Sequence, residues 1–149
     1  MHLPVKPGSA WDGEQIRKFL QTAVIPMRLA VNDGSGFPRL CSLWFGFDGE
    51  AIVAASHANA LICHLLENDG RCAFEIGTNT APYQGVRGQA QVRLDQHAGK
   101  TVLPVLMEKY LGNRYPGLED WLTSRLEQEV ALYLQPEWIS AWDYSSRML

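Results

Sequence analysis

The spacing of apolar and polar positions divides the chain into strand-like and helix-like segments. Alternating or short apolar stretches predict strands over residues 27–33, 38–47, 50–56, 71–77, 86–94, 130–136 and 138–144. Apolar residues three or four positions apart predict helices over residues 9–23, 59–66, 101–112 and 116–128. Most of the strands therefore follow one another in the sequence, with helices placed between groups of them.

Turn-forming residues separate the first strands and indicate antiparallel pairing. Asn, Asp and Gly tolerate positive φ, so residues 32–36 and the pair Asp48-Gly49 predict two hairpins in succession. Ser9 is the expected N-cap of the first helix. Antiparallel strands interrupted by helices fit a mainly β protein, built as a small barrel with flanking helices, better than two separate sheets.

Length and composition favour one domain of a protein that does not act on nucleic acids. The chain has 149 residues, of which 46% are hydrophobic, with a net charge of −3. Phosphate backbones require a basic face, so we expect no nucleic-acid partner. No apolar run approaches the roughly 20 residues of a membrane span, and the first residues lack a signal-peptide core, so no membrane partner is expected. Three cysteines, without CxxC spacing, suggest reduced core thiols and a cytoplasmic location.

Sequence motifs for common catalytic chemistry are absent. The chain contains no GxGxxG, GxxxxGK[ST], HExxH or GxSxG motif. His57, Cys63 and His64 lack the short paired spacing of metal ligands, so no metal site is expected. Ser56 and His57 lie where a strand gives way to a helix, which suits either an anion site or an ordinary N-cap. Arg39 and Arg87 could add positive charge there, or remain solvated on the surface.

The segment WISAWDY combines aromatic and charged residues on a predicted strand. Trp138 and Trp142 are four residues apart and therefore share one face. Asp143 adjoins that pair and Arg147 follows shortly after. Such a face is typical of the wall of a planar ligand's pocket or of a subunit interface.

Taken together, these segments resemble the pyridoxamine 5′-phosphate oxidase-like, FMN-binding split-barrel family. The similarity rests on RLAVNDGSGFPRLCSLWFGFDGEAIVAAS, RCAFEI, YQGVRGQAQV and WISAWDYSSRM in this order, and it covers roughly residues 24–148. The resemblance implies that residues 1–149 form a single FMN-binding domain, an antiparallel, Greek-key-like split β-barrel. It also implies a homodimer with one FMN in each of two clefts between the subunits.

The resemblance also assigns candidate cofactor-binding residues by their position in the motifs. The second strand would run along the flavin ring and ribityl chain, residues at the next strand–helix junction would approach the phosphate, and Trp142 and Arg147 would reach the partner's pocket. The implied set is Arg39, Leu40, Cys41, Ser42, Leu43, Trp44, Ser56, His57, Ala60, Leu61, His64, Tyr83, Gln84, Arg87, Trp142 and Arg147.

One departure from the family concerns the phosphate. Where the oxidase has Ser-Arg-Lys, this chain has Ala60, Leu61 and Ile62. The expected function is therefore an FMN-binding oxidoreductase of unknown substrate, without pyridoxamine phosphate oxidase activity and with no catalytic side chain assigned. A deazaflavin-dependent reductase and a non-catalytic flavin or haem carrier or sensor are the alternatives.

Overall fold

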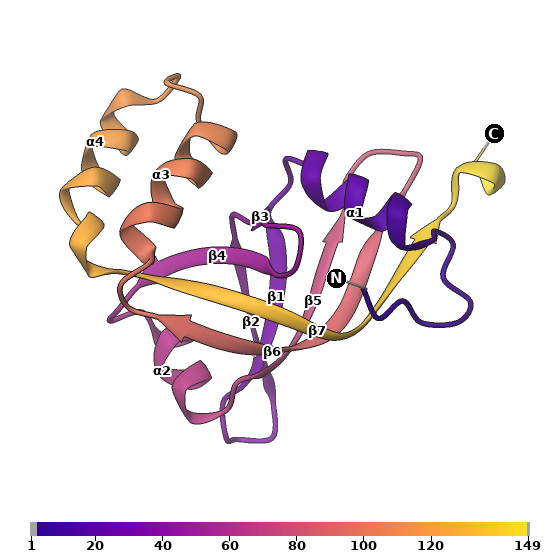
Figure 1. Ribbon diagram of the computed structural model, residues 1–149, viewed down its shortest axis with the longest axis horizontal. Helices are drawn as coiled ribbons and strands as arrows, with labels where there is room; N and C mark the ends of the chain where they lie inside the picture. The colour runs from indigo at the N-terminus through magenta and orange to yellow at the C-terminus, as the bar shows by residue number, and fades with distance from the viewer. Residues whose placement is uncertain (1–2, 149) are drawn as a thin grey trace.

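Seven antiparallel strands form one strongly curved sheet with helices around it (Figure 1). The computed structural model describes residues 3–148. The strands are β1 (Met27–Asn32), β2 (Pro38–Leu43), β3 (Gly46–Phe47), β4 (Ile52–His57), β5 (Arg71–Gly77), β6 (Gln84–Asp95) and β7 (Glu129–Asp143). The helices are α1 (Gly13–Thr22), α2 (Leu61–Asn68), α3 (Gly99–Tyr110) and α4 (Pro116–Ser124), with 3₁₀ turns η1 (Leu126–Gln128) and η2 (Ser145–Arg147).

The sheet curls until its two margins approach each other. Its strand order is β2-β1-β5-β6-β7-β4-β3, and β2 contacts β4 although four strands separate them in the sheet. All pairings between neighbouring strands are antiparallel. The predicted fold, a mainly β split barrel with flanking helices, is confirmed.

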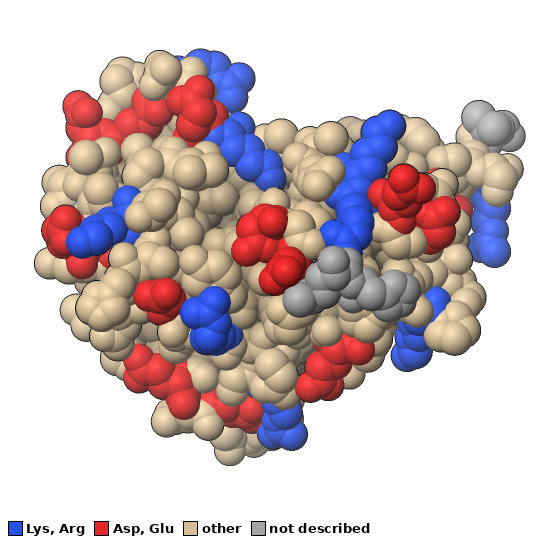
Figure 2. Space-filling model, in the orientation of Figure 1, with Lys and Arg blue, Asp and Glu red and all other residues tan. Residues whose placement is uncertain are grey.

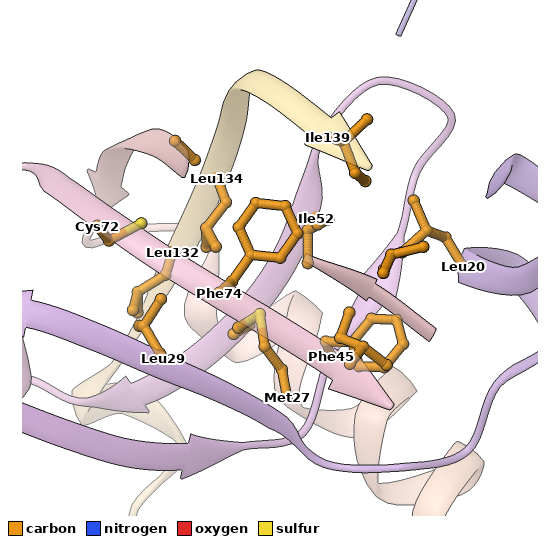
Figure 3. Packing of buried hydrophobic residues seen from close by; sticks show 14 of the residues in the cluster. Leu20, Met27, Leu29, Phe45, Ile52, Cys72, Phe74, Leu132, Leu134 and Ile139 are labelled. Carbon is orange, nitrogen blue, oxygen red and sulfur yellow. The ribbon is translucent and has the colours of Figure 1, made fainter. Parts of the chain in front are cut away.

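The core fills the inside of the curl, where alternate residues of each strand point. Figure 3 shows Leu29 of β1, Phe74 of β5 and Leu132 of β7 meeting there. Phe45 and Leu20 close one end of this core and are fully buried. The alternation of apolar and polar residues thus separates an inner face from an outer face of the sheet.

The first helix starts later than the sequence predicts, and Ser9 is not its N-cap. Asp12 caps α1 instead: its Oδ1 accepts from Gln15 N at 2.9 Å, and Gln15 Oε1 accepts from Asp12 N at 2.9 Å. This reciprocal pair satisfies two backbone donors, more than Ser9 offers. The Ser9 hydroxyl binds β7 instead, accepting from Ala141 N at 3.0 Å.

The predicted strand over residues 38–47 is interrupted after Leu43, and the chain turns before β3. Two side chains of α3 satisfy the backbone at this break: Lys109 Nζ donates to Phe45 O at 2.6 Å, and Phe45 N donates to Tyr110 Oη at 3.2 Å. Because these groups replace the strand ladder, Phe45 can leave the sheet and enter the core.

The two strands predicted over residues 130–136 and 138–144 are one continuous strand, β7. Pro136, which cannot donate to a ladder, lies at the end of the first predicted range. The register shifts at this point: Ala90 pairs with Pro136 and Gln89 with Trp138, so Glu137 is an extra residue. This β-bulge accommodates Pro136 within the strand, and β6 pairs with β7 on both sides of the bulge.

Charged side chains of both signs are interspersed on the face shown in Figure 2. This distribution accords with the small net charge of −3. No helix within residues 3–148 is long and apolar enough to cross a bilayer.

Candidate functional site

Strand β2 divides its predicted site residues between the two faces of the sheet. Cys41 and Leu43 point inward and pack against the core, and burial raises the pKa of the Cys41 thiol. Leu40 lies on the outer face with 73% of its surface exposed. Arg39 sits near the strand's start, where its Nε lies 3.7 Å from Asp33 Oδ2 in an exposed ion pair.

Five of the predicted residues gather around the start of α2, and we call them the α2 cluster: Ser56, His57, Ala60, Leu61 and His64. The Ser56 side chain points inward beside the Cys63 thiol, whose pKa burial raises and Ser56 lowers. Ala60 caps α2 without any side-chain hydrogen bond, and Leu61 is 49% exposed. His64 lies on the exposed side of the helix.

His57 has both ring nitrogens engaged. Its Nδ1 accepts from Asn59 N at 3.0 Å, and Nε2 lies 3.1 Å from Gln128 Oε1. Because the backbone N–H of Asn59 can only donate, the network assigns the ring proton to Nε2, which donates to Gln128. His57 therefore stabilises the β4–α2 turn in this arrangement.

The other predicted residues lie near the last strands and form the C-terminal cluster: Tyr83, Gln84, Arg87, Trp142 and Arg147. Trp142 packs on β5 and β6 at two glycines. A methyl group added at Gly77 would lie 2.8 Å from the Trp142 ring, and one at Gly85 would lie 2.9 Å from it. Only glycine leaves room for an indole so close to the backbone.

The remaining members of the C-terminal cluster surround that indole. Arg87 places its guanidinium carbon 5.4 Å from the centre of the Trp142 ring, a cation–π contact. The Tyr83 carbonyl accepts from Tyr144 N at 2.9 Å, so the residues after β7 are held against the start of β6. Arg147 lies 5.4 Å from the centre of the Tyr144 ring.

Asp143 fastens this end of the chain to the region before α1. Its Oδ2 accepts from Trp11 Nε1 at 3.1 Å, and its Oδ1 accepts from Ser145 N at 2.9 Å. The hydrogen bonds from Ser145, followed by that from Trp11, lower the pKa of Asp143. The aromatic face predicted for this segment is therefore ordered and hydrogen-bonded.

An open groove of about 430 Å³, the outer groove, crosses the outer face of the sheet. Its lining is Arg28, Ala30, Leu40, Ala73, Phe74, Glu75, Arg87, Gly88, Gln89 and Trp138. Trp138 Nε1 donates to Gln89 Oε1 at 2.9 Å at one side. Trp138 and Trp142 both point to this face, as the spacing predicted, while Ile139 and Ala141 between them are buried.

A second cavity of about 400 Å³ lies between the α3–α4 hairpin and the strands, and we call it the helix-covered pocket. Its lining is Pro26, Ser42, Leu43, Trp44, Ala55, Leu103, Leu106, Leu118, Leu122 and Glu129. Trp44 stacks on Tyr110, with ring centres 5.4 Å apart and planes 10° apart. The predicted residues Ser42, Leu43 and Trp44 meet here, beside the helices and away from Trp142.

Glu129 in this pocket was missed by sequence reasoning. It is 5% exposed, and burial raises its pKa while Arg125 and His57 oppose that rise. A glutamate just before the apolar run VALYL was the available signal. It looked like an ordinary boundary residue, because Ser42, Trp44 and Ala55, which share the pocket with it, lie far from it in the sequence.

Within one chain, the α2 cluster and the C-terminal cluster lie at opposite ends of β7. His57 pairs with Glu129, and Gly85 pairs with Trp142. Glu129 and Trp142 are thirteen residues apart on β7. At about 3.3 Å per residue this is about 40 Å along the strand. Figure 1 accordingly shows α2 at the lower left and the C-terminal turn at the upper right.

Comparisons with known proteins define the class of fold. No protein-family model and no curated protein sequence matches the chain. Among solved structures, a conserved hypothetical protein from Mycobacterium tuberculosis is similar over 97% of this chain and 92% of its own, with 18% identity and a TM-score of 0.78.

Two further similar structures carry cofactor names. An F420 reductase is 17% identical over 83% of this chain and 94% of its own, with a TM-score of 0.69. The flavocytochrome Anf3 from Azotobacter vinelandii is 13% identical over 96% of this chain and 76% of its own, with a TM-score of 0.70. At these identities the likeness establishes the fold: the chain is a split barrel of the kind found in pyridoxamine 5′-phosphate oxidase-like proteins.

Proposed function

We propose that this protein binds a flavin between two copies of the chain and acts as an oxidoreductase on a small molecule. The observation that carries the proposal is the C-terminal cluster, in which an indole packs on two glycines beside a guanidinium. A bound FMN supplies the redox chemistry, whereas the protein orients the ring and excludes water.

The outer groove suits the ring part of such a cofactor. Ala30, Leu40 and Ala73 give it apolar surface, and its volume of about 430 Å³ falls in the range of small-molecule sites. Arg87 and Gln89 offer N–H donors at its edge, where the carbonyl oxygens of a flavin's pyrimidine ring could accept. A planar, mostly apolar ring with polar atoms on one edge matches this lining.

The α2 cluster does not fit the phosphate of FMN. Ala60 and Leu61 carry no charge, Ser56 points toward Cys63, and His57 is engaged at both nitrogens. A charge-assisted hydrogen bond contributes about 1.5–3 kcal/mol, and Ala60 and Leu61 cannot supply this binding free energy to a phosphate. We therefore propose that the ring dominates recognition and that the phosphate adds little.

A second copy of the chain is proposed because one copy separates the two clusters by about 40 Å along β7. Large apolar side chains are also exposed on the β1–β2 hairpin: Phe37 is 77% exposed and Leu40 is 73% exposed. A twofold-related partner would cover such residues and could bring its C-terminal cluster toward β2 of the first copy.

The test compares riboflavin with FMN, which differ by the phosphate. Flavin fluorescence quenching should give dissociation constants within about tenfold of each other, since one charge-assisted bond is worth about that factor. Light scattering after gel filtration should report a dimer. Protein that stays colourless after soaking in excess riboflavin and FMN would overturn the proposal of a flavoprotein, and a flavin-binding monomer would overturn the interface.

The runner-up is a deazaflavin-dependent reductase. An F420 reductase shares the fold, and the missing phosphate clamp fits a cofactor other than FMN. The long acidic tail of that cofactor favours a basic groove, whereas this chain has a net charge of −3. Parallel titrations with F420 and riboflavin distinguish a deazaflavin-dependent protein from a flavin-dependent one. A cofactor that binds but is not reduced by any donor tested would identify a carrier or sensor.

A further inference from the structure

The α3–α4 hairpin lines the helix-covered pocket, which shares no lining residue with the outer groove. Leu103 and Leu106 of α3, with Leu118 and Leu122 of α4, face Trp44 and Ala55 across about 400 Å³. In Figure 1 the two helices rise at the upper left, above the ends of β4 and β7. The pocket is therefore lined by residues of the strand region on one side and by the two helices on the other.

The helical side of the pocket is held less firmly than the strand side. Among its described residues α4 has none that is buried, and Leu118, Trp121 and Tyr115 are 42%, 54% and 55% exposed. The strands below contribute fully buried residues such as Leu132 and Ala54. Elements with few buried contacts open at lower free energy than the core, so α4 is the less stable wall of the pocket.

One charged group lines this pocket from the sheet. Glu129 pairs with His57 in the β4–β7 ladder and is 5% exposed. Its Oε2 is buried and has no hydrogen-bond partner among residues 3–148. A buried carboxyl oxygen without a partner is destabilising, and a ligand that donates a hydrogen bond to Oε2 would remove this cost.

The nearby cation does not supply that partner. Arg125 influences Glu129 electrostatically, but within residues 3–148 no ion pair of 4.0 Å or less joins them. The Arg125 guanidinium carbon lies 4.4 Å from the centre of the Trp121 ring, and its Nε is also buried without a partner. His57 donates to Gln128 instead.

We propose that the helix-covered pocket binds a small apolar organic cation, whose ammonium group pairs with Glu129 and whose body contacts the leucines of α3 and α4. An ammonium group can donate a hydrogen bond to Glu129 Oε2, and its positive charge complements the carboxylate. The aromatic surface of Trp44 adds a second favourable contact for a cation. This proposal stands without any flavin at the outer groove.

The test uses phenethylamine and 2-phenylethanol, which match in shape and differ in the charged head. Calorimetry at neutral pH should show the amine binding at least tenfold more tightly than the alcohol. Glu129→Gln should abolish that preference and leave the affinity for the alcohol unchanged. Equal affinities in the wild-type protein, a preference that survives Glu129→Gln, or no binding of the amine would each overturn the proposal.

Two controls separate ligand binding from folding. Glu127→Gln removes an exposed carboxylate two residues away, whose partner Lys100 lies at 3.7 Å, and should leave the preference intact. Leu118→Trp should fill the pocket and weaken both probes. Thermal unfolding of Glu129→Gln should occur at or above the wild-type temperature without ligand; an unfolded variant would show that the carboxylate is structural and would overturn the proposal.

Discussion

The two ends of β7 differ in how well they are equipped to hold a ligand. At the α2 end, the side chains near His57 are small, apolar or already hydrogen-bonded, apart from the exposed His64. At the C-terminal end, Trp142 packs on glycines and carries Arg87 beside it, with Tyr83 and Arg147 nearby. The same sheet thus provides an aromatic and cationic surface at one end and a nearly uncharged turn at the other.

This contrast indicates which part of a cofactor the protein can recognise. An aromatic ring beside a guanidinium binds planar groups through dispersion and cation–π contacts, which need no phosphate. An anion requires donors or positive charge that remain free, and the α2 cluster offers neither a lysine nor an arginine.

The largest effect is expected at the C-terminal end. Trp142→Ala should weaken riboflavin binding by more than about tenfold, because Trp142 holds Arg87, which lines the outer groove, through a cation–π contact. It should also reduce the free energy of unfolding by about 2–3 kcal/mol, since a half-buried indole leaves a cavity over Gly77 and Gly85. Fluorescence titration and urea denaturation measure the two effects.

Trp121→Ala is the matched control for that substitution. Trp121 is 54% exposed on α4, away from the outer groove, so riboflavin affinity should not change. If both tryptophan variants lose affinity equally, Trp142 has no specific role in the ring site.

A smaller effect, of opposite sign, is expected at the α2 end. Leu61→Arg should strengthen FMN binding about three- to fivefold, because Leu61 is 49% exposed and an exposed ion pair adds only up to about 1 kcal/mol. Riboflavin binding should not change. Leu61→Gln, which adds polarity without charge, is the control, and an equal gain for riboflavin would show that the phosphate lies elsewhere.

The smallest effect concerns acid stability at the C-terminal end. Hydrogen bonds from Ser145 and Trp11 lower the pKa of Asp143 in the folded protein, so their stabilisation is present above about pH 4. It is lost as the pH falls through the lowered pKa, because the folded state must then protonate the carboxylate. Asp143→Asn should flatten this part of the curve of unfolding free energy against pH.

That experiment is read as a difference between wild type and variant, because other carboxylates also titrate there. Ser145→Ala removes one donor to Asp143 and should give a smaller change of the same kind. Identical acid curves for all three proteins would contradict the role of Asp143 in fastening this end of the chain.

The sequence by itself determined where most strands and helices lie, which faces of the strands are apolar, and the order of the elements. Alternation in residues 86–94 and 138–144 predicted that Trp138 and Trp142 share a face, and both lie on the outer face of the sheet. Local pattern succeeds here because a strand's side chains alternate regardless of what packs on them. The division into two strands over residues 130–136 and 138–144 was wrong, since only the pairing with β6 shows that a bulge accommodates Pro136 within one strand.

Tertiary structure alone decided how the candidate residues are grouped. The sequence places Ser42 and Trp44 beside Arg39, yet the fold brings them to leucines of α3 and α4 and to Glu129. It also separates Ser56 from Trp142 by most of the length of β7. Burial and partners depend on segments far away in the chain, so a sequence pattern can name such residues, but only packing fixes which of them share a site.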